Sequence, residues 1–425
     1  MLETIKNAWR VVDIRKKIFF TLLIIVVFRI GSVIPVPFID YVGLRELSGG
    51  AINEFFSYLS TLTGGGLEYG AIFALGVQPY INSSIIVQLL TVAIPVLERW
   101  SKEGEEGRKK IAKVTRFVTV ILALIQGSAY YVYLQKVGCI AHKGAALWFI
   151  APVVVLTLTA GSALVMWLGE QIDAKGIGNG ISMLLFAGII SRAPQAFDLL
   201  FGYLKAGEYI LVAAIVIVFL VMIGFIVWMT NAERRIPVQY AKRVVGRKMY
   251  GGQNTHIPIK VNMSGVMPVI FASSILMLPT MILSFMGNNT NNTWAKIFSL
   301  FSVRGAFYAI LYLVLIVAFA YFYVTIQYNP VEMANNLRKN SGAIPGIRPG
   351  QPTSDFISKI LSRITLMGAL FLGVIAVLPI LISMFGVQGI TLGGTSILIV
   401  VGVALDIVQN LESQLMMRHY KGFLD

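Results

Sequence analysis

The sequence predicts an all-α polytopic membrane protein with ten transmembrane helices. Hydrophobic residues make up 56% of the 425 residues and charged residues only 13%, whereas a soluble domain carries about 25% charged residues. A water-facing globule is excluded, because there are too few polar side chains to cover its surface. The apolar residues are also gathered into long runs, and the basic residues are gathered between them.

Ten stretches are apolar and long enough to cross a bilayer, for which a helix needs about 20 residues. The first follows Lys16 and Lys17, as in a secretion signal, but no small-residue cleavage site follows it. We therefore expect a retained helix. The expected spans are residues 18–36, 71–94, 114–135, 148–169, 180–201, 208–230, 264–286, 304–327, 362–385 and 393–411.

The basic residues indicate which side of the membrane each loop occupies. With ten spans, both termini share one side. The loops and tails of that side hold 27 of the 35 Lys and Arg residues, and the opposite loops hold 7. Short loops rich in Lys and Arg stay in the cytoplasm. Both termini are therefore expected to be cytoplasmic.

One segment between the first two spans is too short to cross. Residues 52–66 have the length for three helical turns before Gly64, Gly65 and Gly66 interrupt them. Two interpretations are open. One is an amphipathic helix on the outer membrane surface, which these residues alone favour. The other is a re-entrant piece folded into a cavity, where non-spanning backbone is tolerated at membrane depth.

A shared motif indicates an internal repeat. GVQPYINSS begins at Gly76 in the second span and GVMPVIFASS begins at Gly265 in the seventh. Chance similarity between apolar stretches is the alternative. As the second span of each group of five, they predict an inverted five-span repeat, which places a functional path between its copies. We expect these two spans to face each other, with Pro79 and Pro268 bending their helices.

The span centres carry few ionisable residues, although transporters and pumps usually need them. Arg29 lies near the outer end of its span, and Asp406 lies near the cytoplasmic side of the last one. Residues 176–180 match a nucleotide-binding loop only weakly, since no strand precedes them. We expect no enzyme, no cofactor and no metal site. A secondary transporter of a small solute is the alternative function, but it predicts polar groups at mid-membrane.

Two expected cytoplasmic loops are long and basic. Residues 231–263 carry seven Lys and Arg, and residues 328–361 include Arg338, Lys339 and Arg348. The positive-inside bias explains the sign of these charges but not the length of the loops. Such loops suit an anionic partner, either a protein surface or the phosphate backbone of RNA.

Seven long motifs, spread from about residue 9 to residue 420, resemble the SecY family, the channel subunits of the bacterial protein-export translocon. They are FRIGSVIPVP (28–37), GVQPYINSSIIVQLLTVAIP (76–95), KEGEEGRKKI (102–111), MWLGEQIDAKGIGNGIS (166–182), HIPIKVNMSGVMPVIFASS (256–274), NPVEMANNLRKNSGAIPGIRPG (329–350) and LGGTSILIVV (392–401). The resemblance implies a polypeptide channel of the bacterial inner membrane. It also implies two five-helix halves, residues 1–203 and 204–425, around a central hourglass pore.

The resemblance also implies roles for particular residues. Residues 52–66 would be the plug, a short helix that closes the outer side of the pore, which reverses the preference for a surface helix. The waist would be a ring of aliphatic side chains. Spans two and seven would form a lateral gate, through which apolar segments reach lipid. Phe38 departs from the family, which commonly has glycine there, and Val77 and Leu185 replace common isoleucines. The ring residues would be Val77, Ile81, Ile181, Leu185, Ile270 and Ile399; the plug residues Phe55, Phe56, Leu59, Gly64 and Gly65; and the gate residues Ser84, Gln88, Ser273 and Ser274.

Partners follow from the same resemblance. The loops 231–263 and 328–361 would receive the SecA motor ATPase or the ribosome, with Arg247, Lys248 and Arg348 as the expected contacts. SecE and SecG would complete the membrane complex. The chain itself would hydrolyse nothing, and its partners would drive transport.

Overall fold

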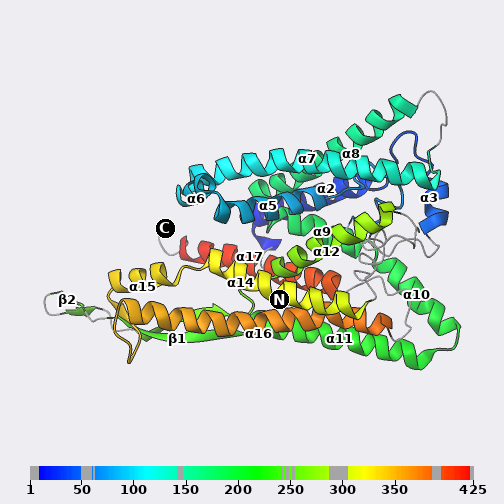
Figure 1. Ribbon diagram of the computed structural model, residues 1–425. Helices are drawn as coiled ribbons and strands as arrows, with labels where there is room; N and C mark the ends of the chain where they lie inside the picture. Colours follow the sequence, from blue (N-terminus) through cyan, green and yellow to red (C-terminus); the bar gives the residue numbers. More distant parts are fainter. Residues whose placement is uncertain are drawn as a thin grey trace.

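The structure is a computed structural model that describes residues 9–48, 60, 63–140, 147–240, 243–245, 248–250, 254–286, 305–384 and 394–421. Within these ranges the chain is mostly helical, and each of the ten expected spans contains a helix (Figure 1). In the described part, seven helices are long and apolar enough to span a membrane, and a pair bent by 101° adds an eighth. The protein is therefore a multi-span membrane protein.

Most of the first half of the chain forms one group of packed helices, which occupies the upper part of Figure 1. Its elements are α2 (Val12–Gly31), α3 (Tyr41–Ser48), α5 (Gln78–Ala93), α6 (Pro95–Lys102), α7 (Glu105–Val137), α8 (Leu147–Lys175) and α9 (Gly180–Ile190). Helix α10 (Ala193–Lys205) follows α9 but lies lower in the figure, beside the second half. Helix α8 is central, because it contacts α2, α5, α7 and α9. The bent pair is α5 and α6. It breaks at Ile94, where the following Pro95 disfavours helical backbone.

The second half forms a second group, drawn below the first in Figure 1. Its helices are α11 (Tyr209–Asn231), α12 (Met267–Met286), α14 (Ala306–Gln327), α15 (Pro330–Lys339), α16 (Gln351–Met384) and α17 (Gly394–Lys421). Helix α16 contacts α12, α14, α15 and α17. Helix α5 contacts α12 and helix α9 contacts α17 across the two groups, and α10 contacts α11. The second and seventh expected spans thus lie against each other, while the inverted relation of the halves stays a prediction.

The long loops contain strands, so the all-α expectation holds for the membrane part but not for these loops. Strand β1 (Glu233–Tyr240) pairs antiparallel with β4 (Asn254–Lys260), with Glu233 opposite Lys260. Strand β5 (Gly342–Ala343), from the second long loop, pairs with the other edge of β1. Strands β2 (Arg243–Val245) and β3 (Lys248–Tyr250) form a separate hairpin. Strand β1 forms because its apolar residues alternate with others along the sequence. Ile236 and Val238 therefore lie on one face of the strand and are buried against residues of α15 and α16.

The prediction that Pro79 and Pro268 bend their helices is wrong. Pro79 lies in the first turn of α5, and Pro268 is the second residue of α12. At a helix start the missing N–H of proline leaves no bond unmade, so both residues begin helices rather than kink them. Helix α5 starts at Gln78, and residues 63–77, which include the first part of the expected span 71–94, are mostly buried turns.

The two copies of the shared motif begin in the same backbone conformation. Gly76 and Gly265 have φ angles of 52° and 59°, in the left-handed region that favours glycine. Phe38 has a φ angle of 69°, which gives a physical reason for the glycine that the SecY resemblance associates with this position.

Candidate functional site

Four helices bring the six predicted ring residues into one cluster. Val77, Ile81, Leu185 and Ile399 are buried members of a single apolar core, and Ile181 and Ile270 are half-buried and pack against it. Val77 and Ile81 are one turn apart at the start of α5, and Ile181 and Leu185 are one turn apart on α9, so each pair shares a face of its helix. Ile270 comes from α12 and Ile399 from α17. We call these six residues the aliphatic ring.

A small cavity lies beside the aliphatic ring, with room for no more than about one water molecule. Ile81, Leu185, Ile270 and Ile399 contribute to its walls, together with Val269 and four polar residues. Within the described residues, this cavity is therefore too small to admit a polypeptide, and the side chains around it are mostly apolar. The polar residues of the wall are Gln78, Ser273, Ser274 and Thr395.

The seam between α5 and α12 carries only part of the predicted lateral gate. Ser273 and Ser274 line the cavity, whereas Ser84 and Gln88 are half-buried on α5 and are not part of its wall. The Ser273 hydroxyl donates to the Ile270 carbonyl at 2.9 Å. The Ser274 hydroxyl is buried and has no hydrogen-bond partner among the described residues. An unpaired buried hydroxyl stabilises the closed seam less than a paired one.

Within the predicted plug, the structure describes Ser60 and residues 63–66, so Phe55, Phe56 and Leu59 lie outside the described residues. Ser60 is helical, and its carbonyl accepts a hydrogen bond from the Gly65 N–H at 2.8 Å. Gly64 has a φ angle of 67°. This combination is the Schellman ending of a helix, in which a left-handed residue follows the last turn. Among the described residues, the backbone at Ser60 and Gly64 therefore has the geometry of a helix end.

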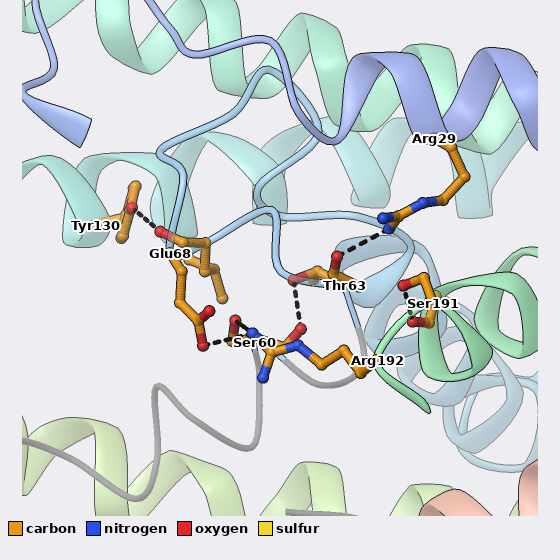
Figure 2. Close-up of polar contacts among 10 residues, drawn as sticks. Arg29, Ser60, Thr63, Glu68, Tyr130, Ser191 and Arg192 are labelled. Carbon is orange, nitrogen blue, oxygen red and sulfur yellow. Dashed lines mark hydrogen bonds and ion pairs between the residues drawn. The ribbon is translucent and has the colours of Figure 1, made fainter. Parts of the chain in front are cut away.

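Two arginines hold this helix end (Figure 2). The Arg29 guanidinium, from α2, donates to the Gly64 carbonyl at 2.8 Å. Arg192, at the break between α9 and α10, donates through Nη2 to the Ser60 hydroxyl at 2.7 Å and forms an ion pair with Glu68. Arg192 is only 5% exposed. The described end of the segment, Ser60 and residues 63–66, is thus buried inside the protein, which favours the re-entrant interpretation.

Residues 63–77, which we call the buried loop, continue this pattern of internal pairing. The Tyr130 hydroxyl of α7 donates to the Leu67 carbonyl at 2.7 Å, and the Ser162 hydroxyl of α8 donates to the Gly76 carbonyl at 3.3 Å. Non-helical backbone at membrane depth needs such partners, because lipid supplies none.

The predicted partner contacts are spread over two loops. Arg348 is exposed, and its carbonyl accepts a hydrogen bond from the Thr353 hydroxyl at 2.8 Å, which fixes the backbone there. Lys248 lies on β3. Arg247 lies outside the described residues.

Sequence reasoning missed the roles of Arg192 and Glu68. From the sequence alone, Arg192 is one of the seven basic residues of the expected outer loops, and Arg29 lies near the outer end of its span. The available signal was that both arginines adjoin long apolar runs, where an isolated charge needs a partner.

Comparisons with known proteins place the chain among translocon subunits. The SecY family model matches residues 71–408. The chain is 45% identical over 442 residues to the protein translocase subunit SecY of Streptomyces coelicolor, and 43% identical over 442 residues to that of Halalkalibacterium halodurans. Each alignment covers 100% of both chains.

Solved structures share the fold at low sequence identity. A protein-conducting channel matches with a TM-score of 0.65 at 20% identity, covering 94% of this chain and 92% of that one. A SecY structure, described by the role of its plug domain in stabilising the closed channel and maintaining a membrane seal, matches with a TM-score of 0.65 at 19% identity and the same coverage. Sec61 from a canine ribosome–channel complex matches with a TM-score of 0.59 at 18% identity, covering 94% and 92%.

Gly64→Ala should loosen the helix end at Ser60. A Cβ at position 64 would lie 2.6 Å from Arg29 Nη1 and 3.0 Å from Gly188 Cα, in addition to the strain of the left-handed backbone. We would introduce Thr63→Cys, at a buried position, and measure its labelling by a membrane-impermeant maleimide. Labelling should become several-fold faster when Gly64→Ala is added.

Gly104→Ala is the matched control. Gly104 has a φ angle of 75°, but nothing lies within 4 Å of an added Cβ, so it supplies backbone strain of about 1–3 kcal/mol without a clash. Burial raises the pKa of the native Cys139 thiol, which keeps background labelling slow. Equal labelling rates in the two glycine variants would contradict the close seat of Gly64.

Proposed function

The chain belongs to the SecY family, and we propose that it conducts unfolded polypeptides through its aliphatic ring. As a family member it is the protein-conducting channel subunit of a translocase. The observation that carries the proposal for the ring is that all six aliphatic side chains belong to or pack against one apolar core, and that four of them, from α5, α9, α12 and α17, line one small cavity.

The chemistry of the aliphatic ring suits a substrate that presents every side chain in turn. Aliphatic groups offer neither charge nor hydrogen bonds, so they contact a passing segment by dispersion alone and favour no sequence. When no substrate is present, a narrow apolar constriction tends to lose its water and resists ions. One set of residues thus supports both unselective passage and a seal.

We propose that the seam between α5 and α12 is the lateral gate. Ser273 and Ser274 lie on its α12 side, and Ser84 and Gln88 lie on α5. When the seam parts, a segment in the pore meets lipid. An apolar segment of about 20 residues then leaves sideways, because its burial in hydrocarbon is favourable. A polar segment stays in the pore and is threaded through.

We further propose that partners supply the driving force, and that the chain itself catalyses no reaction. Sec61, a structural neighbour, was solved in a ribosome–channel complex, and Ssh1, another, was solved bound to the yeast 80S ribosome. By family analogy the partners here are the ribosome or SecA on the loops 231–263 and 328–361, and SecE and SecG in the membrane. The same analogy, with the distribution of basic residues, supports the bacterial inner membrane and cytoplasmic termini.

Ile270→Asn should make the closed channel leak ions. An amide in the ring binds water, so the constriction wets and conductance of the empty channel in planar bilayers should rise several-fold. Export of precursors with defective signals should rise as well. Ile270→Leu, which keeps the site apolar and of similar volume, is the control and should remain sealed. Unchanged conductance in Ile270→Asn would remove Ile270 from the ring.

Arg348→Glu should slow motor-driven export several-fold while leaving the protein folded and inserted. The residue is exposed, so its charge reversal acts on a partner rather than on the core. Export of a secretory precursor into proteoliposomes, driven by the motor ATPase, measures the effect. Arg338→Glu makes the same charge change at another exposed site of this loop and serves as the control. Equal export by wild type and Arg348→Glu would exclude Arg348 as a contact.

A further inference from the structure

We propose that Asp173 is a positioning residue for the aliphatic ring, because its carboxylate fixes the start of α9 against α8. The inference rests on the proposed function and adds to it a residue that determines where two of the six ring side chains lie. These two are Ile181 and Leu185, in the first two turns of α9. Asp173 does not touch the polypeptide itself and acts through them.

A single hydrogen bond joins the Asp173 carboxylate to the first residue of α9. The Gly180 N–H donates to Asp173 Oδ1 at 2.7 Å. As an N–H of the first turn, it has no acceptor within its own helix, and Gly180 is buried. A carboxylate suits this position, because the N-terminal end of a helix carries partial positive charge and a charged acceptor strengthens the bond. Asp173 therefore stabilises α9 where its first residue meets α8.

The face of α8 that carries Asp173 also makes room for a ring side chain. Gly169 lies one turn before Asp173, so the two residues share this face. A Cβ at Gly169 would lie 2.6 Å from Ile181 Cδ1, so the absence of a side chain at Gly169 leaves the space that Ile181 occupies. Asp173 holds the backbone immediately before Ile181. The position of this ring residue thus depends on both contacts with α8.

Two neighbouring hydrogen bonds stabilise the same region but do not join α9 to α8. The Asn179 side chain accepts from the Ser182 N–H at 3.1 Å, which caps α9 internally. The Ile177 N–H donates to Thr21 Oγ1 at 3.2 Å, which joins the preceding loop to α2. Loss of the Asp173 bond would therefore leave α9 helical and its loop attached, while the first turn of α9 could shift along α8.

Asp173→Ala tests the positioning role by disulfide crosslinking to a secretory precursor that carries one cysteine and is stalled in the channel. With Ile181→Cys as the partner, crosslinking should fall several-fold, because the first turn of α9 is no longer held at α8. With Ile270→Cys on α12 as the partner, it should stay within about twofold. The Asp173 side chain is exposed, so its truncation leaves no cavity in the core.

Asp173→Asn and Glu170→Ala separate the hydrogen bond from a general loss of charge on α8. Asparagine keeps an acceptor oxygen, so Asp173→Asn should keep crosslinking at Ile181→Cys within about twofold of the level with Asp173. Glu170→Ala is the matched control, because the Glu170 carboxylate lies one turn before Asp173 but pairs with Arg116 of α7 at 2.6 Å. It should leave crosslinking at Ile181→Cys unchanged.

Several outcomes would overturn the role of Asp173. They are unchanged crosslinking at Ile181→Cys in Asp173→Ala, an equal loss in Asp173→Asn or Glu170→Ala, and an equal loss at Ile181→Cys and Ile270→Cys. Failure of the proposed function has a different signature, since with Asp173 intact neither ring cysteine would then crosslink to the stalled precursor. Crosslinks at both positions that Asp173→Ala does not alter would contradict only the positioning role.

Discussion

A bilayer requires that any backbone which is not helical finds its hydrogen-bond partners inside the protein. Residues 63–77 meet this requirement, although they are turns and almost entirely buried. Arg29 of α2, Tyr130 of α7 and Ser162 of α8 each donate to a carbonyl of this loop. The same bonds fix these helices around the loop. The loop in turn ends at Val77 of the aliphatic ring, so the position of the ring depends on its pairing.

Close helix packing makes the first half of the chain a firm support for the aliphatic ring. A Cβ at Gly161 of α8 would lie 2.1 Å from the Ile72 carbonyl oxygen, and one at Gly180 would lie 1.9 Å from the Gly169 carbonyl oxygen. Only glycine permits these approaches, and the second one fixes the start of α9 just before Ile181. The seam with α12, by contrast, contains the Ser274 hydroxyl, which has no partner within the part of the chain that the structure describes. Movement at the seam therefore disrupts less bonding than movement within the first half.

The sequence predicts the membrane part well, because the length of an apolar run largely determines whether it becomes a spanning helix. Helix ends follow other rules. Helix α16 begins at Gln351 and α7 at Glu105, in polar sequence ahead of the expected spans 362–385 and 114–135. Strand β1 pairs with β4, and two other strands lie between them in the sequence. The alternation of apolar residues in β1 is short, so it does not by itself predict a strand.

The polar contacts of the candidate site were the least predictable feature. Arg192 and Ser60 are separated by 132 positions, and no local pattern connects them. The aliphatic ring, by contrast, came from residue-by-residue resemblance to the SecY family, and the structure brings all six side chains together. A long motif assigns each of its residues to a position in a known fold. A single buried ion pair between distant residues can be found only when the packing of the helices is known.

The ring and the arginines serve two needs that one set of residues cannot meet. A constriction that accepts every side chain must lack directional bonds, so it cannot hold a plug firmly either. Directional bonds must therefore lie outside the ring, and Arg29 and Arg192 supply them at the Gly64 carbonyl and the Ser60 hydroxyl. Packing without directional bonds and attachment through directional bonds are thus provided by different residues.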